Sequence, residues 1–230
     1  MAGPQAARRL TGRRLVLALL LLCLTEGAMA QTPDLPPIVA AAEKGDLGEL
    51  KRRIDARADI EARDGTGRTA LLAATHGNHI EAARLLIAAG ADVNAKDQRQ
   101  DSAYLYAGAE GHLAILRLTL KAGADLKSTN RYGGTALIPA AHHGHVEVVR
   151  EMLKTKVDID HVNRLGWTAL LEAIILGDGG PRHVEIVRLL VNAGANLDLP
   201  DREKVTPLAH AERRGQAQIA EILKAAGAKR

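Results

Sequence analysis

The sequence predicts an all-α solenoid of stacked helix-turn-helix units joined by hairpin-like loops. The first reason is an internal repeat, because the motif "TAL" and its variants return every 33 residues along most of the chain. The second is that each period holds two short segments with apolar residues at helical spacing. The third is composition: aromatic residues make up 2% of the chain and Phe is absent, so Ala and Leu must fill a core of closely packed short helices.

The period divides the chain into a leader and one repeat domain. The motif begins at Thr69, Ser102, Thr135, Thr168 and Thr206. The last interval is 38 residues long because "DGGPR" is inserted at 178–182, either as a lengthened surface turn or as an added contact loop. The predicted parts are a signal peptide at 1–30 and a repeat domain at 31–230, with an N-terminal cap at 35–64, repeats at 65–97, 98–130, 131–163 and 164–201, and a C-terminal cap at 202–230.

The first thirty residues have the order of a secretory signal peptide. A basic segment with four Arg precedes a ten-residue apolar run, and "AMA" at 28–30 offers small residues for cleavage between Ala30 and Gln31. A bilayer span needs about 20 residues, so this run is too short, although an uncleaved anchor is the alternative interpretation. We expect export to the periplasm, with secretion from the cell as the alternative. Arg13 and Arg14 leave open whether the Sec or the twin-arginine route is used.

Removal of this leader changes the charge and cysteine content. Residues 1–30 carry four Arg and one Glu, a net +3, so the +4 of the whole chain falls to +1 for residues 31–230. A nearly neutral domain gives no indication of binding to nucleic acid or to an anionic membrane. The only cysteine, Cys23, lies in the leader, so the repeat domain has neither a disulfide nor a thiolate ligand.

Each unit is built from two helices whose ends the sequence marks. We expect the hydroxyls of Thr69, Thr135 and Thr168 to cap the first helix of their units. A residue at positive φ should end that helix. The residues in this place are Asn78, Gly111, Gly144 and Gly177. The second helix is amphipathic, as in "HVEVVREMLK" at 145–154, and "AGAD" or "AGAN" usually closes it.

This unit resembles the ankyrin repeat over residues 35–230. The family pattern is a hairpin with Asp-x-x-Gly-x-Thr, followed by Pro-Leu-His-x-Ala-Ala, Gly-His-x-Glu and Gly-Ala-Asp, and the repeat "GTGRTALLAATHGNHIEAARLLIAAGADVNAKD" follows most of it. The resemblance implies a solenoid that binds other proteins, similar to exported ankyrin-repeat proteins of the bacterial periplasm.

Departures from the family pattern predict where the units differ. The His of Pro-Leu-His is absent from every unit, so its hydrogen bond to the hairpin must be replaced or lost. Lys156 stands where Gly should end a second helix, at a cost of about 1 kcal/mol. Gln100 and Lys204 replace the hairpin Gly, so we expect irregular loops at these two places.

The segment "AAHHGHVEVVREML" at 140–153 places three histidines beside a carboxylate, as in many metal sites. The period assigns His145 and Glu147 to the scaffold, because equivalent residues recur in other units. His142 and His143 end a first helix, at positions that vary in the family and face the groove, so we interpret them as pH-sensitive partner contacts. Three histidines at i, i+1 and i+3 cannot face one centre from a helix, so we predict no metal and no other cofactor.

Motifs of the common enzyme classes are absent from the sequence. It has no Gly-x-Ser-x-Gly elbow, no phosphate-binding Gly-rich loop and no His-Glu-x-x-His helix. We therefore predict a monomeric, non-enzymatic protein whose partners are proteins. Two alternatives stay open: an accessory protein that handles a metal or small ligand in the groove, and a secreted effector that binds a foreign protein.

Ankyrin arrays bind proteins through the hairpin tips and the exposed ends of the first helices, and the resemblance carries both strips onto this chain. The candidate tip residues are Arg68, Arg99, Asp101, Arg131, Tyr132, Arg164, Leu165 and Trp167. The candidate helix-end residues are His76, Glu110, His142, His143, Ile175 and Leu176, with Arg213 and Arg214 in the C-terminal cap. We expect the contact centre in the third and fourth repeats, where Tyr132 and Trp167 lie on adjacent tips beside apolar side chains.

Overall fold

Six consecutive helix pairs make up residues 35–229, the part of the chain that the computed structural model describes. The first helices of the pairs are α1 (Pro37–Lys44), α3 (Ala70–His76), α5 (Ala103–Ala109), α7 (Leu137–His142), α9 (Ala169–Ile175) and α11 (Pro207–Arg213). The second helices are α2 (Leu47–Asp55), α4 (Ile80–Ala88), α6 (Leu113–Lys121), α8 (Val146–Met152), α10 (Pro181–Asn192) and α12 (Ala217–Ala225). The predicted signal peptide and its cleavage site at Ala30 and Gln31 lie outside the described residues.

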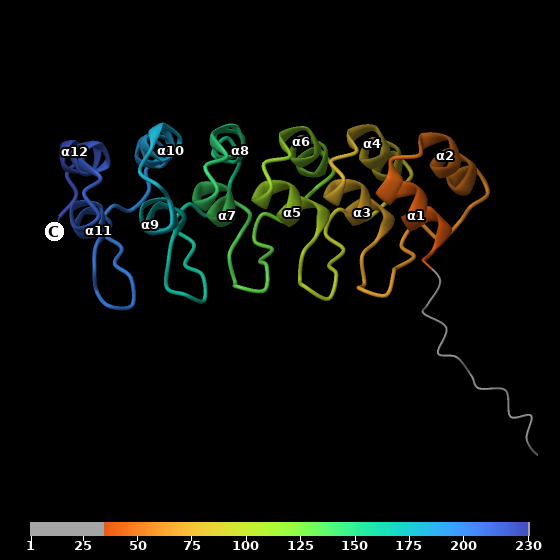
Figure 1. Cartoon of the computed structure of the whole chain (residues 1–230), viewed down its shortest axis with the longest axis horizontal. Coiled ribbons are helices and arrows are strands. Elements are labelled where there is room, and N and C mark those ends of the chain that lie inside the picture. Colours follow the sequence, from red (N-terminus) through yellow and green to blue (C-terminus); the bar gives the residue numbers. More distant parts are fainter. Residues whose placement is uncertain (1–34, 230) are drawn as a thin grey trace, which may run out of the picture. The chain divides into compact units, whose positions relative to one another are not determined.

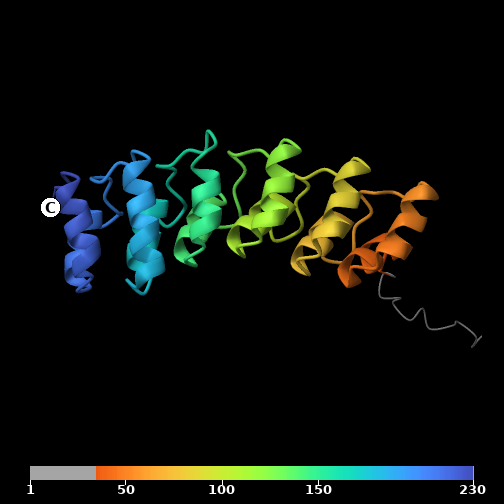
Figure 2. The same ribbon diagram turned by 90° about the horizontal axis from the view of Figure 1, so that it is seen from above.

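The helix pairs stack in one row, and the loops between pairs project from the side of the first helices (Figure 1). Each first helix packs against the first helix of the next pair, and the second helices do the same. Figure 2 shows the same pairs side by side from above. The predicted all-α solenoid is confirmed: residues 35–229 contain no strand, only an isolated bridge between Arg63 and Thr69.

One hydrophobic core runs through the row and consists mainly of Ala, Leu, Ile and Val. Small side chains on the first helices, such as the fully buried Ala73 and Ala74, let neighbouring helices approach closely. Tyr104 is an exception, because it is fully buried and its hydroxyl has no hydrogen-bond partner. The core is therefore built from small and branched aliphatic residues, as the composition predicts.

Hydroxyl caps start four of the first helices. Thr69, Ser102, Thr168 and Thr206 each accept a hydrogen bond from the backbone amide three residues further on, at 3.2–3.3 Å. The prediction for Thr135 is wrong, because its buried Oγ1 has no partner. Pro139 has no N–H to donate to the Thr135 carbonyl, which instead accepts from Ile138 at 3.2 Å. That bond occupies the amide that a capping hydroxyl would need.

The turns between paired helices follow the prediction except at the insertion. Asn78, Gly111 and Gly144 have φ values of 52°, 75° and 76°. Gly177 does not have positive φ, and Gly179 adopts the left-handed conformation in its place, at 69°. Asp178 reorganises this turn, since its Oδ1 accepts from the Gly180 amide at 2.8 Å and bonds His183 Nδ1 at 2.7 Å.

The end of α8 shows how the chain manages without the helix-ending Gly. Lys156 is not at positive φ, and α8 has seven residues where α4 and α6 have nine. Thr155 closes the helix instead: its hydroxyl donates to the Met152 carbonyl at 2.6 Å and accepts from the Val157 amide at 3.2 Å. A side-chain bond therefore replaces a backbone turn.

Gln100 and Lys204 occupy the hairpin Gly positions without disturbing the loops. Their φ values are 65° and 61°, in the left-handed region that favours Gly. The Gln100 amide still donates to the Asp97 carbonyl at 3.0 Å, as the Gly133 amide donates to Asn130 at 2.9 Å. The predicted irregularity is therefore wrong, and the replacement costs backbone strain instead.

Candidate protein-binding groove

An Asp or Asn at the same register holds each hairpin. These residues are Asp64, Asp97, Asn130, Asn163 and Asp201. In the first four, one side-chain oxygen accepts two backbone amides of the loop, at 2.8–3.1 Å. Asp201 accepts from Val205 at 2.9 Å. The tips are thus fixed by a local side-chain-to-backbone turn, which gives side chains on them a defined position.

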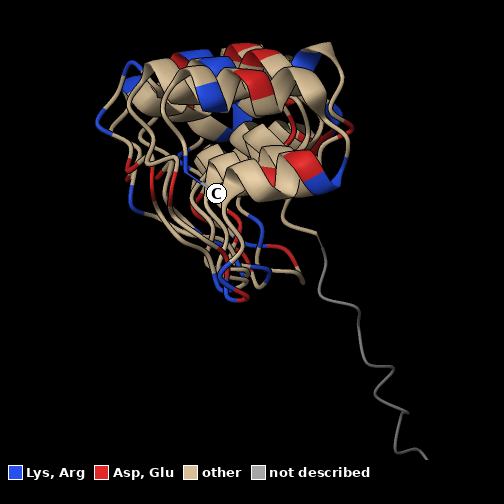
Figure 3. Cartoon of the chain, turned by 90° about the vertical axis from the view of Figure 1, so that its left-hand side faces the viewer, with Lys and Arg blue, Asp and Glu red and all other residues tan. Residues whose placement is uncertain are grey.

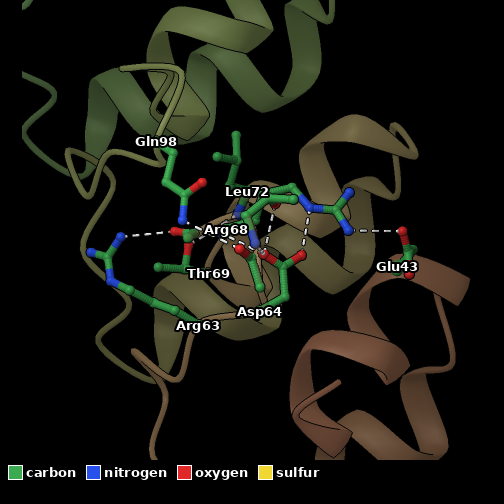
Figure 4. A network of polar contacts seen from close by, with 10 residues as sticks. Glu43, Arg63, Asp64, Arg68, Thr69, Leu72 and Gln98 are labelled. Atoms are coloured by element: carbon green, nitrogen blue, oxygen red, sulfur yellow. Dashed lines mark hydrogen bonds and ion pairs between the residues drawn. The ribbon is translucent and has the colours of Figure 1, made fainter. Parts of the chain in front are cut away.

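The first of these residues, Asp64, is kept ionised by its hydrogen-bond partners (Figure 4). Its second oxygen accepts from Nε of Arg68 at 2.7 Å, and Arg68 also reaches Glu43 at 3.1 Å. Burial alone would raise the pKa of Asp64, but the hydrogen bonds from Thr66 and Arg68 outweigh it and lower the pKa to about 2. Arg68, a predicted contact residue, is therefore engaged in the scaffold.

Neighbouring tips are tied together by long basic side chains. Nη1 of Arg63 donates to the Lys96 carbonyl at 2.6 Å, and Lys96 Nζ donates to the Thr129 carbonyl at 2.7 Å. Arg164 donates to the Arg131 carbonyl at 3.0 Å, and Arg202 donates to the Arg164 carbonyl in turn. Figure 3 shows both Lys or Arg and Asp or Glu on the loops below the helices. These bonds stabilise the stack where the family histidine is missing.

In the last two units, the residue that follows the family histidine position makes the bond to the hairpin instead. Glu172 Oε1 accepts from Nδ2 of Asn163 at 2.8 Å. In the next unit His210 Nε2 bonds Oδ2 of Asp201 at 2.6 Å. The same register holds Ala73, Tyr106 and Pro139, for which no such bond is formed. Among residues 35–229, the hairpin Asp or Asn is thus bonded to a side chain of the helix that follows it in the fourth repeat and the C-terminal cap.

A groove with a cavity volume of about 380 Å³ lies under the tips of the second to fourth repeats. Nine of the predicted contact residues line it: Arg99, Asp101, Glu110, Arg131, Tyr132, His142, His143, Leu165 and Leu176. Residues outside the predicted set complete the walls and floor: Tyr106, Ala109, Asn130, Gly134, Ile138, Pro139, Asn163 and Glu172. Side chains that are far apart in sequence therefore share one concave surface.

Three large apolar side chains stand exposed at this groove. The exposed fractions are 53% for Tyr132, 47% for Leu165 and 42% for Leu176. Arg131 lies over the Tyr132 ring, with its Cζ 4.7 Å from the ring centroid. Nη1 of Arg131 is also 3.7 Å from Oδ2 of Asp101. An apolar centre with charged residues at its edge is the composition of a protein-binding surface.

Other predicted contact residues lie outside the groove. Trp167 is half-buried and does not line it, and Ile175 is also half-buried. His76 stacks on Tyr106 with ring centroids 3.8 Å apart, and its buried Nε2 has no hydrogen-bond partner. In the C-terminal cap Arg213 is exposed, and Arg214 donates to the Gly177 carbonyl at 3.4 Å. The structure therefore places Tyr132 in the groove without Trp167.

The repeated histidines join neighbouring units. His79 Nε2 bonds the Glu43 carbonyl at 3.0 Å, and His183 Nε2 bonds the His142 carbonyl at 2.8 Å. In the third repeat it is His143 whose Nδ1 bonds the preceding unit, at the Ala109 carbonyl at 2.7 Å. His143 was expected to be a groove residue alone, but it both lines the groove and joins two units.

Glu172 is the groove residue that sequence reasoning missed. Its side chain is 8% exposed, and burial raises its pKa to about 7. Oε2 lies 3.9 Å from Nδ1 of His142, whose pKa is lowered first by burial and then by His143. The signal in the sequence is an acid inside the apolar run "ALLEAII", at a position where the other units hold no acid.

Neither a metal site nor a membrane span is found in the part of the chain that the structure describes. Within residues 35–229 no group of three or more His, Cys, Asp or Glu side chains is placed to hold a metal ion. Within the same residues no helix combines the length and apolar character needed to cross a bilayer.

Comparison with known proteins places the chain in a family. A sequence profile described as ankyrin repeats (3 copies) matches residues 5–97, 38–130 and 103–198. The chain is 49% identical over 57 residues to YahD, described as an ankyrin repeat protein of Escherichia coli K12, and spans 28% of the length of that relative. An ankyrin repeat domain from Acinetobacter baumannii is 58% identical, with a TM-score of 0.82 over 84% of this chain and 98% of the other.

Two more solved structures agree with this. The ankyrin repeat protein EF0377 is 39% identical, with a TM-score of 0.80 over 83% of this chain and 98% of the other. The ankyrin repeat domain of Bcl-3, a member of the IκB family, is 26% identical, with a TM-score of 0.77 over 85% of this chain and 88% of the other. The chain belongs to the ankyrin repeat family.

Proposed function

We propose that this chain is an exported, non-enzymatic scaffold that binds another protein in the groove across the second to fourth repeats. Ankyrin repeats in general mediate protein–protein interactions and are typically scaffolds without catalytic activity. The observation that carries the proposal is the exposure of Tyr132, Leu165 and Leu176 at one concave surface. Exposed large apolar side chains gathered in this way mark interaction sites more often than ordinary surface.

Rigid support of the groove strengthens the proposal. Its tips are held by the hairpin side-chain bonds of Asn130 and Asn163, and Arg164 ties the third tip to the fourth. A preorganised surface loses little conformational entropy on binding, so more of the contact energy appears as affinity. We therefore expect a partner that docks onto the groove as it stands.

Export is the second part of the proposal and rests on the sequence of residues 1–30. The basic segment, the short apolar run and the small residues before Gln31 have the order of a cleavable signal. The periplasm is the proposed location, and release from the cell is distinguished from it by fractionation. N-terminal sequencing of the mature protein should begin at Gln31, and a cytoplasmic protein that retains Met1 would contradict export.

Affinity capture in the native compartment tests the binding function. The tagged protein should retain a specific protein partner that is lost when Tyr132 and Leu165 are both changed to alanine. Val162→Ala is the matched control, because Val162 is also exposed, at 49%, but does not line the groove. Equal capture by all three proteins would show that the groove is not the contact surface.

A further inference from the structure

The floor of the groove carries a carboxyl group with one oxygen unused. Glu172 lies in α9 and lines the cavity, and only 8% of its side chain is exposed. Oε1 accepts the hydrogen bond from Asn163. No hydrogen-bond donor among residues 35–229 reaches Oε2, and the nearest positively chargeable atom is Nδ1 of His142 at 3.9 Å. Oε2 is not one of the buried side-chain atoms that are sealed off without a partner, so it opens onto the groove, where a ligand can supply a donor.

Charged groups on the elements packed against α9 do not supply that donor. On α7, His142 and His143 face Glu172, and burial lowers the pKa of His142, which favours its neutral form. On α10, His183 is bonded to Asp178 and to the His142 carbonyl, Arg182 lies beside Gly144, and Glu185 pairs with Arg150 and Arg188. On α11, His210 is bonded to Asp201 and Arg214 to the Gly177 carbonyl, Glu212 pairs with Lys224, and Arg213 is exposed.

The charges at the rim leave an entry for a cation. Arg131 lies near Asp101 and over the Tyr132 ring, so its charge is partly compensated. Arg99 belongs to the hairpin two repeats before α9, and Glu110 adds a further acid to the lining. Leu165 and Leu176 add exposed apolar surface to the same lining. A ligand with an apolar stem and a positively charged tip matches a lining that combines apolar side chains with a carboxyl group.

A single free oxygen selects between the two basic side chains of proteins. Arginine binds carboxylates best through two parallel hydrogen bonds, which need both oxygens. Asn163 already donates to Oε1, so an arginine fork would have to share that oxygen with Asn163. Lysine presents one compact charge on a four-carbon stem and needs only one oxygen.

We propose that the groove receives a lysine side chain of the partner protein, with its ammonium group on Oε2 of Glu172. This rests on the proposed binding function and adds the chemistry by which the partner is recognised. The stem lies against Leu165 and Leu176, and the partner's backbone stays at the level of the hairpin tips.

Binding of the ammonium is coupled to loss of a proton from Glu172. Burial keeps part of the Glu172 population protonated near neutral pH, and only the ionised form attracts the cation. Affinity for the ammonium group therefore rises as pH rises through the Glu172 pKa of the empty groove and levels off above it. Between pH 6 and pH 8 a group with a pKa of about 7 goes from mostly protonated to mostly ionised, which gives about a tenfold gain in affinity.

The lysine side chain alone can serve as the probe, so the test is independent of the partner. We expect n-butylammonium chloride, titrated at constant ionic strength, to shift the methyl NMR signals of Leu165 and Leu176 in the purified protein. The apparent affinity should rise about tenfold from pH 6 to pH 8. Butanol, which has no charge, and n-butylguanidinium, which needs two oxygens, should each bind about tenfold more weakly than n-butylammonium at pH 8.

Two variants separate the assignment from general effects. Glu172→Gln keeps the shape and the Asn163 bond, and should lose both the pH dependence and about tenfold in affinity for n-butylammonium at pH 8. Glu147→Gln removes an exposed charge on α8, away from the groove, and should bind as the unchanged protein does. Circular dichroism of Glu172→Gln checks that the fold is retained.

The outcomes that overturn the assignment are distinct. Equal binding of n-butylammonium by Glu172→Gln, or an affinity that does not change with pH, would remove Glu172 from the recognition site. Equal binding of n-butylguanidinium would overturn the choice of lysine. Sedimentation that shows a dimer dissociated by n-butylammonium would assign the lysine to a second copy of this chain instead of a different protein. Failure here leaves partner capture through Tyr132 and Leu165 intact, so the two proposals fail separately.

Discussion

Nδ2 of Asn163 donates a 2.8 Å hydrogen bond to Oε1 of Glu172, joining the fourth hairpin to the helix that it precedes. The next unit makes the equivalent bond with the chemistry reversed, because Asp201 is the acceptor and His210 the donor. Donor and acceptor are therefore matched within each unit. The Asn163 amide can donate to the Glu172 carboxyl group, and the Asp201 carboxylate can accept from the His210 imidazole.

This matching predicts a rescue by exchange. Asn163→Asp should lower the free energy of unfolding by about 2 kcal/mol at pH 7, because the two carboxyl groups that then face each other cannot both ionise without repulsion. Adding Glu172→His to this variant recreates the pair of the C-terminal cap and should recover most of the loss. Urea denaturation of the two variants measures both effects, and a double variant no more stable than Asn163→Asp would contradict the matching.

The raised pKa of Glu172 predicts how its contribution to stability depends on pH. The folded-state pKa is about 7 and the ordinary value is 4.5, so the folded protein holds this proton more tightly than the unfolded chain. The stability contributed by Glu172 is therefore fully present below pH 4.5 and is lost as pH rises toward 7. Glu172→Gln should become more stable than the unchanged protein by up to about 3 kcal/mol at pH 8, and the difference should shrink toward pH 4.5. A difference independent of pH would show that Glu172 titrates normally.

The buried hydroxyl of Tyr104 predicts a stabilising substitution. Tyr104 is fully buried and its hydroxyl lacks a hydrogen-bond partner, at a register where other units hold Leu. Tyr104→Phe removes the unsatisfied group and should raise the free energy of unfolding by about 1 kcal/mol. Tyr106→Phe is the control, because Tyr106 is only half-buried and lies at the groove, and should change stability by less than about 0.5 kcal/mol. Thermal unfolding of both variants measures these changes. A loss of stability in Tyr104→Phe would contradict the claim that the Tyr104 hydroxyl lacks a partner.

Two hairpins carry strain that glycine would relieve. Gln100 and Lys204 have positive φ, which is sterically unfavourable for a residue with a Cβ atom. The equivalent residues Gly67, Gly133 and Gly166 adopt positive φ without this cost. Gln100→Gly and Lys204→Gly should each gain about 0.5–1 kcal/mol, after the greater flexibility of Gly in the unfolded chain is deducted. Gly133→Ala is the reverse test and should be destabilising, since its Cβ would also lie 2.8 Å from Cγ of Arg164. Loss of stability in both Gly variants would show that the loops hold these residues by side-chain contacts.

The period of 33 residues predicted the fold, the helix pairs and most of their ends, because each unit repeats one local pattern. Prediction failed where a single residue altered a local bond, as when Pro139 deprived Thr135 of its cap or Asp178 moved the positive φ from Gly177 to Gly179. The register also brought nine predicted contact residues to one groove. It could not show that Trp167 is half-buried and does not line that groove, since packing across units decides the burial of a large ring. Glu172 was missed because an acid in a first helix has meaning only once Asn163 and His142 are placed beside it.

The dissociation constant of the captured partner tests the binding function most directly. Calorimetric titration should show that the double change of Tyr132 and Leu165 to alanine weakens binding by at least about tenfold, because truncating central apolar residues of an interface costs about 2 kcal/mol or more. Val162→Ala should bind within about twofold of the unchanged protein, since an exposed residue outside the interface contributes little. Equal affinities for all three proteins would contradict binding through the groove.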